Sequence, residues 1–196
     1  ASLRGSLIRS PLEMLFGVFN ATSSVPSYDL AGNSDMYLAF YWLGDTMGQA
    51  YATPPSVAGW PAYYQVPSYS QLWINSTTIK TRFDIATALT VFTGIPVGMN
   101  NFKINSLGFL NGLSMPDDAP TVINDMCEVF CPKPIGTVQK LTLKAILTNG
   151  LPDWEWTLQY NEYLANPGDP TFSDPIRQRV ENTLYNLFRM PEFQTI

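Results

Sequence analysis

Histidine, the side chain that most often does acid–base chemistry near neutral pH, is absent from the 196 residues. Histidine is the usual general base, completes Ser-His-Asp and Cys-His sites, and binds zinc and haem. Any reaction would therefore depend on carboxylates, lysine, tyrosine, cysteine or a metal held by oxygen atoms. The sequence predicts no metal and no cofactor. Whether the protein is an enzyme stays open at this point, and the residue types favour a non-catalytic protein.

Two acidic pairs could do acid–base work or bind Ca²⁺. One pair is Asp117-Asp118, and the other is Asp169 with Asp174 around a proline-rich turn. Glycosidases use paired carboxylates, and calcium sites need about six to eight oxygen ligands. Neither pair has that ligand density, and Asp169 and Asp174 also suit a turn and a helix cap. A carboxylate-based hydrolase is therefore the third functional hypothesis.

The two cysteines, Cys127 and Cys131, are spaced to share one face of a helix that Pro132 ends. Buried free thiols are the favoured interpretation, because cysteine is among the most buried residue types. A strained disulfide comes second, since helical Cβ vectors do not favour closure. A two-cysteine metal site comes third. The sequence leaves these three states open.

Aromatic residues are concentrated in one short loop segment. Trp60, Tyr63, Tyr64, Tyr69 and Trp73 fall within residues 60–73. Flat amphipathic rings stack on sugars or on the apolar surface of a partner protein. The alternative is that the two tryptophans are anchors turned inward and that the tyrosines cover the loop. We expect that, if the segment binds anything, it does so through the tyrosines.

Arg82 lies in a helical segment that is apolar on two faces, which predicts a central and buried helix. A buried guanidinium must be paired or hydrogen-bonded. We expect its partners to be Asp45, Gln49 and carbonyl groups of residues 54–60. A structural clamp that holds this loop to the helix is favoured over an anion-binding site.

The elements that must position these residues are helices. Ser10 and Pro11 predict a helix start, Gly48 predicts a left-handed cap, and Asp174-Pro175 predicts the start of the last helix. Residues 93–118 are predicted to be loop with at most one short element. The spacing of apolar residues predicts about seven helices, near 11–19, 34–47, 76–92, 120–131, 138–149, 153–165 and 175–188. Without a convincing strand pair and with long loops, the prediction is an all-α fold with non-bundle packing.

Three pieces of the chain together carry a family resemblance. They are Gly48-Gln49, PPSVAGWP at 54–61 and WINSTTIKTRF at 73–83. With SPLE at 10–13 and MPEFQ at 190–194, they resemble the domain-of-unknown-function 1800 family. The structural motif comprises Gly48, Gln49, Pro54, Pro55, Gly59 and Arg82. The insert YYQVPSYSQL at 63–72 departs from the family pattern, in which a short glycine-rich turn is usual.

The resemblance implies a single helical domain over residues 1–196 that is the carboxy-terminal piece of a longer protein. It also implies a bacterial, exported protein, located in the periplasm, at the cell surface or outside the cell. Genes of this family often neighbour those of sulfatase-like exported proteins, which suggests such a protein as the partner. No reaction or catalytic residue comes with the resemblance.

The charge distribution narrows the classes of partner. The net charge is −5 and no lysine or arginine run is present, which argues against nucleic acid as a partner and against an anionic membrane surface. No apolar run is long enough for a transmembrane span. The leading hypothesis is an exported, non-catalytic helical scaffold or partner-binding module. The alternative is a carbohydrate-binding module that uses the aromatic loop 60–73.

Overall fold

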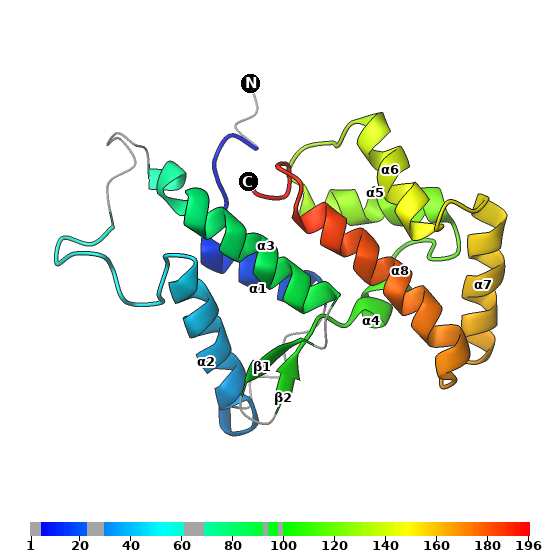
Figure 1. The fold of residues 1–196 in the computed structure, drawn as a ribbon, viewed down its shortest axis with the longest axis horizontal. Helices are drawn as coiled ribbons and strands as arrows, with labels where there is room; N and C mark the ends of the chain where they lie inside the picture. The colour runs from blue at the N-terminus through cyan, green and yellow to red at the C-terminus, as the bar shows by residue number, and fades with distance from the viewer. Residues whose placement is uncertain (1–4, 23–29, 61–68, 92–93, 98–99) are drawn as a thin grey trace.

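The computed structural model describes residues 5–22, 30–60, 69–91, 94–97 and 100–196. In these residues the chain is mainly helical, with eight α-helices and one short hairpin (Figure 1). This confirms the predicted all-α class. The elements are α1 (Pro11–Ala21), α2 (Leu30–Thr46), the 3₁₀ helix η1 (Tyr69–Trp73), α3 (Ser76–Thr90), β1 (Ile95–Val97), β2 (Asn100–Phe102), α4 (Ser106–Asn111), α5 (Ala119–Phe130), α6 (Thr137–Leu147), α7 (Asp153–Ala165) and α8 (Pro170–Phe188).

Capping side chains set the starts of the first and third helices. At α1, the Ser10 backbone N–H donates to Glu13 Oε2 at 2.8 Å, and the Ser10 hydroxyl accepts from the Glu13 N–H at 3.4 Å. At α3, the Asn75 side chain accepts from two backbone N–H groups of the first turn, each at 2.9 Å. Both caps satisfy donors that the helix itself cannot pair. The predicted starts of these helices are confirmed.

The start of the last helix differs from the prediction. The carboxylate of Asp169 accepts from the Thr171 N–H at 2.8 Å, and Pro170 occupies the first turn of α8. Asp174 is therefore inside the helix, and Pro175 lies within it rather than at its start. The prediction failed because the chain holds two Asp-Pro pairs five residues apart, and both carry the same start signal.

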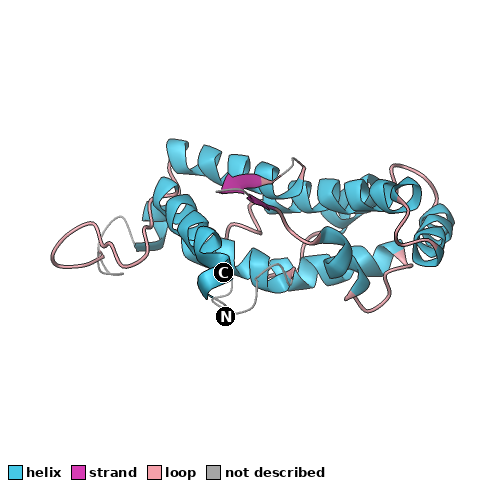
Figure 2. Ribbon diagram, turned by 90° about the horizontal axis from the view of Figure 1, so that it is seen from below, coloured by secondary structure: helices cyan, strands magenta, loops and turns pink. Residues whose placement is uncertain are grey.

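Helix α8 packs against α3, α4, α6 and α7, and it runs from near the middle of the molecule toward its lower right in Figure 1. Its inward face is fully apolar over Ile176, Val180 and Leu184. The predicted burial of α3 is confirmed at Ile85, Ala86 and Leu89, whereas Ile79 and Phe83 are only partly buried. Seen from below, the molecule is elongated, with helices along its upper and lower sides (Figure 2).

The stretch 93–118 holds more structure than predicted. β1 pairs antiparallel with β2, with Ile95 opposite Phe102, and α4 follows. Gly94 begins this stretch at φ +103°, and a Cβ there would lie 2.6 Å from the Phe102 carbonyl oxygen. Only glycine allows this approach without a clash. The Ile104 N–H then donates to the Leu89 carbonyl at 3.3 Å, which joins the hairpin to α3.

The first and last described segments of the chain run side by side. The Arg9 N–H donates to the Gln194 carbonyl at 2.8 Å, and the Ile196 N–H donates to the Leu7 carbonyl at 2.9 Å. In the described ranges, no helix combines the length and the apolar character that a membrane crossing requires.

Candidate functional site

Arg82 lies on the inward face of α3 and has no exposed surface. One terminal nitrogen of its guanidinium donates to Gln194 Oε1 at 3.1 Å and approaches the Met14 sulfur at 3.8 Å. The other donates to the Arg9 carbonyl oxygen at 2.8 Å. The predicted burial of Arg82 is confirmed, and its hydrogen bonds join α3 to both chain ends.

The predicted partners of Arg82 are wrong. Asp45 is exposed near the end of α2, and residues 54–58 are exposed as well. Gln49 has a different role, because its side-chain oxygen accepts from the Leu12 N–H at 3.0 Å in the first turn of α1. Arg82 therefore holds the first and last described segments of the chain rather than residues 54–60, which we call the proline loop.

Arg9 is a second arginine beside Arg82. Its guanidinium donates to the carbonyls of Phe130 and Thr195, at 3.0 and 3.2 Å, and lies 4.8 Å from the centre of the Phe193 ring. Among the described residues, neither arginine forms an ion pair with a carboxylate. Burial, and then the nearby charge of Arg9, lower the pKa of Arg82 to about 10. The terminal nitrogens of Arg82 already donate to oxygen atoms of the protein, which favours a structural clamp over an anion site.

Gly48 and Gln49 join α2 to α1. Gly48 has φ +91°, and its N–H donates to the Asp45 carbonyl at 2.8 Å, as expected of a left-handed helix cap. Gln49 follows and caps α1. A Cβ on Gly44 would lie 2.6 Å from the Gln49 carbonyl oxygen, so only glycine fits where these segments meet. This part of the family motif has a structural explanation.

The proline loop projects from the body next to α2 (Figure 1). Pro54 and Pro55 are exposed, and Gly59 adopts φ +93°. The expectation that this loop packs on α3 is therefore wrong for residues 54–58. Trp60 is half-buried against Trp73, with the ring centres 5.1 Å apart, and Trp73 is buried. Trp73 is thus the inward anchor of the aromatic segment.

The tyrosines of that segment cannot be placed in the same way. Tyr63 and Tyr64 lie outside the described residues, and so does the side chain of Tyr69 at the start of η1. The carbohydrate-binding alternative stays a prediction.

The acidic pairs serve helix ends and a surface ion pair. Asp118 accepts from the Thr121 N–H at 3.0 Å at the start of α5, and Asp174 pairs with Arg177. Four cavities of the described surface contain at most one carboxylate each. Within the part of the chain that the structure describes, three or more histidine, cysteine, aspartate or glutamate side chains do not gather to hold a metal.

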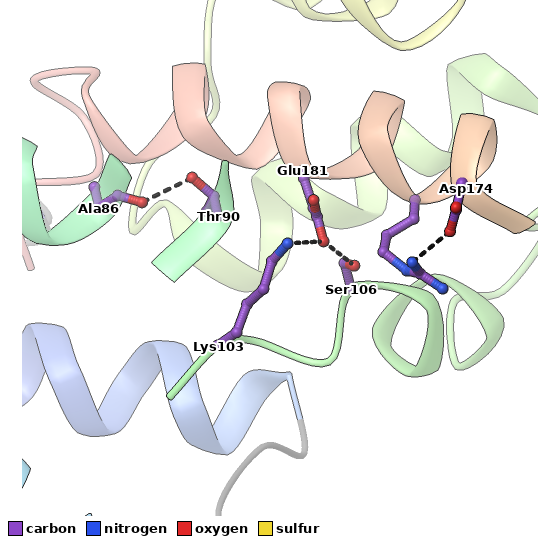
Figure 3. Close-up of polar contacts among 7 residues, drawn as sticks. Ala86, Thr90, Lys103, Ser106, Asp174 and Glu181 are labelled. Atoms are coloured by element: carbon purple, nitrogen blue, oxygen red, sulfur yellow. Dashed lines mark hydrogen bonds and ion pairs between the residues drawn. The ribbon is translucent and has the colours of Figure 1, made fainter. Parts of the chain in front are cut away.

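A buried polar cluster around Glu181 was not predicted. Glu181 on α8 accepts from the Ser106 hydroxyl at 3.0 Å and pairs with Lys103 Nζ at 2.9 Å (Figure 3). These bonds tie α8 to the segment between β2 and α4. The sequence feature that could have indicated this cluster is a glutamate directly after Val180, beside the apolar stripe of α8. Its long-range partners could not be read from the sequence.

Helix α6 is apolar on both sides, and the sequence pattern selects the wrong one. Val138 and Leu141 are part of the stripe used to predict this helix, yet they are 77% and 56% exposed. Leu143 and Leu147 are buried instead. Periodicity locates a helix, but it cannot say which of two apolar faces meets the core.

Helix α7 repeats this arrangement. Trp154 and Leu158, which predicted the helix, are 62% and 50% exposed, whereas Trp156 and Tyr160 are buried. Leu151 in the connecting turn is also exposed. We call the exposed apolar side chains on α6, α7 and the turn the α6–α7 surface. Its members are Val138, Leu141, Leu151, Trp154 and Leu158.

Comparison with known proteins gives one match. The family described as "Protein of unknown function (DUF1800)" matches residues 1–195. No curated protein and no solved structure matches the chain. The match covers nearly every residue, well beyond the segments at 10–86 in which the resemblance is densest. The chain therefore belongs to the DUF1800 family.

Proposed function

We propose that this chain is an exported, non-catalytic helical module that binds a partner protein through the α6–α7 surface. The observation that carries the proposal is the exposure of large apolar side chains on two successive helices and their turn. On each helix two large apolar side chains are exposed at helical spacing, Val138 with Leu141 and Trp154 with Leu158, and such exposed pairs support an interaction site. The helices that carry them are held by the core through Leu143, Leu147 and Trp156, so the surface is presented on a rigid support.

Charge around the surface indicates the kind of partner. Helix α7 contains Asp153, Glu155 and Glu162 but no lysine or arginine. Asp153 pairs with Lys144 across the turn at 2.8 Å, and Glu155 lies near the positive charge of Arg179 on α8. A second copy that docked α7 against α7 would bring like charges together, whereas a partner with basic groups opposite α7 would be attracted. The occupant that we propose is a different protein with an apolar centre and basic edges.

The family resemblance suggests the identity of that protein. Sulfatase-like exported proteins are the neighbours that it implies, and binding to one of them would place this chain in the same exported compartment. None of the four described cavities brings together the two carboxylates that a carboxylate-based hydrolase would use.

Binding to a sulfatase-like exported protein of the same organism, the partner that the family resemblance suggests, tests the proposal. The full chain is immobilised, and the affinity is measured by biolayer interferometry for wild type and for Trp154→Ser. Because a central aromatic contact contributes about 2 kcal/mol or more, we expect a loss of at least about 30-fold. Trp42→Ser is the matched control, since Trp42 on α2 is 55% exposed and lies outside the α6–α7 surface.

The control variant should bind as wild type does. An equal loss in Trp42→Ser and Trp154→Ser, or no binding of wild type at micromolar concentrations, would overturn the proposed surface. Fractionation of the native cells tests export separately, because the protein should be found outside the cytoplasm.

A further inference from the structure

The two cysteines face one pocket at the end of α5. Cys127 and Cys131 are both nearly buried and unbridged, and both line a cavity of about 320 Å³. The Cys131 N–H donates to the Cys127 carbonyl at 2.9 Å, so helical spacing continues to Cys131 although the backbone becomes extended there. The thiols therefore stand one helical turn apart on the same wall.

This spacing suits a bridging ion better than a disulfide. Side chains four residues apart on a helix have Cβ atoms about 5–6 Å apart. A disulfide needs a Cβ separation of about 3.5–4.5 Å, so closure would require the backbone to move. Two metal–sulfur bonds of about 2.3 Å each would instead fill the gap between the sulfurs.

The donor set and the charges of the pocket narrow the class of ion. In the described residues no third histidine, cysteine or carboxylate joins the two thiols to make a tetrahedral set. Two soft donors alone suit an ion that accepts two ligands. Lys133 and Lys140 also line the cavity. Burial raises the pKa of both thiols, that of Cys131 to about 12, and the positive charges of Lys140 beside Cys127 and of Arg9 beside Cys131 partly offset these shifts.

We propose that this pocket binds one soft monovalent cation of the copper(I) class between the Sγ atoms of Cys127 and Cys131. Each thiol releases its proton to solvent as its sulfur–metal bond forms, and no oxidation state changes. The bound unit of one M⁺ and two thiolates carries a charge of −1, and of the charged residues that line the cavity, Lys133 and Lys140 offset this charge while Glu128 adds to it. This site is separate from the α6–α7 surface and does not depend on the proposed function.

Titration of the reduced full-length chain with copper(I), without oxygen and against a chromogenic copper(I) chelator, tests the site. We expect one ion per chain. Cys127→Ser and Cys131→Ser should each weaken binding by more than about 100-fold, because loss of an outer-shell group alone costs about 10–100-fold. Lys140→Gln keeps both sulfurs and should weaken binding by about 10-fold. Met115→Leu removes an exposed sulfur elsewhere and should have no effect.

X-ray absorption of the copper(I)-loaded wild type tests the coordination without relying on any variant. Two sulfur ligands at one distance are expected. Three or more ligands, or nitrogen and oxygen neighbours, would overturn the two-coordinate site. So would a double serine variant that is folded by circular dichroism and still binds one ion. If each single variant kept nearly the wild-type affinity, the thiols would bind ions independently, which also contradicts the proposal.

Discussion

At the scale of single residues, Arg82 shows how a buried charge can be held without an acid. Its partners are the Arg9 carbonyl and the amide oxygen of Gln194, and the neighbouring guanidinium of Arg9 is repulsive. The hydrogen bonds stabilise the fold, whereas the charge opposes burial. Arg82 is therefore a connector whose geometry matters more than its charge.

This balance predicts an unusual order of stability among variants of Arg82. Arg82→Met leaves two acceptors unpaired but also removes the buried charge, so we expect a loss of about 1–3 kcal/mol. Arg82→Lys keeps the charge and lacks the planar fork that reaches both oxygens. The lysine variant should therefore be the less stable of the two in urea unfolding. A lysine variant more stable than the methionine variant would mean that the charge itself stabilises the fold through an acidic or anionic partner.

At the scale of helices, local sequence signals were sufficient to locate each helix, but they did not show which of its faces meets the core. Ser10 and Asn75 mark helix starts because a cap bonds its own first turn, and such contacts are short in sequence. The outward faces of α6 and α7 are apolar, so the pattern of Val138 and Trp154 located both helices and misjudged their orientation. The orientation is set by packing on α8, which no local pattern contains.

The two Asp-Pro pairs of α8 allow a direct test of which residue caps it. Hydrogen bonds from the backbone and the hydroxyl of Thr171 lower the pKa of Asp169. A carboxylate whose pKa is lowered on folding stabilises the protein above its unfolded pKa, and this contribution is lost as pH falls through the folded value. Asp169→Ala should thus lower the melting temperature at pH 7, and the difference from wild type should shrink below about pH 4.

Asp174→Ala is the matched control for that series. Asp174 forms a partly exposed ion pair with Arg177 within the helix, and such pairs contribute little. Its melting temperature should stay near that of wild type at every pH. A larger loss in Asp174→Ala than in Asp169→Ala would move the start of α8 back to the position that the sequence pattern favoured.

At the scale of the whole molecule, long-range contacts carry the parts that sequence reasoning missed. The hairpin at 95–102 depends on a glycine approach to Phe102, and the Cys127–Cys131 pocket and the α6–α7 surface depend on how helices pack. Residue spacing alone placed Cys127 and Cys131 on one face of a helix and located helices α6 and α7. It could not place them against other segments, because those segments are distant in sequence.

The same contacts predict that the chain unfolds as one cooperative unit. One continuous core includes residues from α1 to α8, and α8 packs on α3 as well as on α7. Arg82 on α3 adds a further connection, because it donates to both the Arg9 carbonyl and the Gln194 side chain. Local opening of one half would therefore expose core residues that pack against the other half.

We expect hydrogen exchange followed by mass spectrometry to show peptides from α3 and α7 losing protection at the same urea concentration. Peptides from the exposed residues 51–58 provide the reference for unprotected amides at every concentration. Loss of protection in α7 while α3 remains protected would divide the chain into two units, and the single-domain prediction would then be wrong.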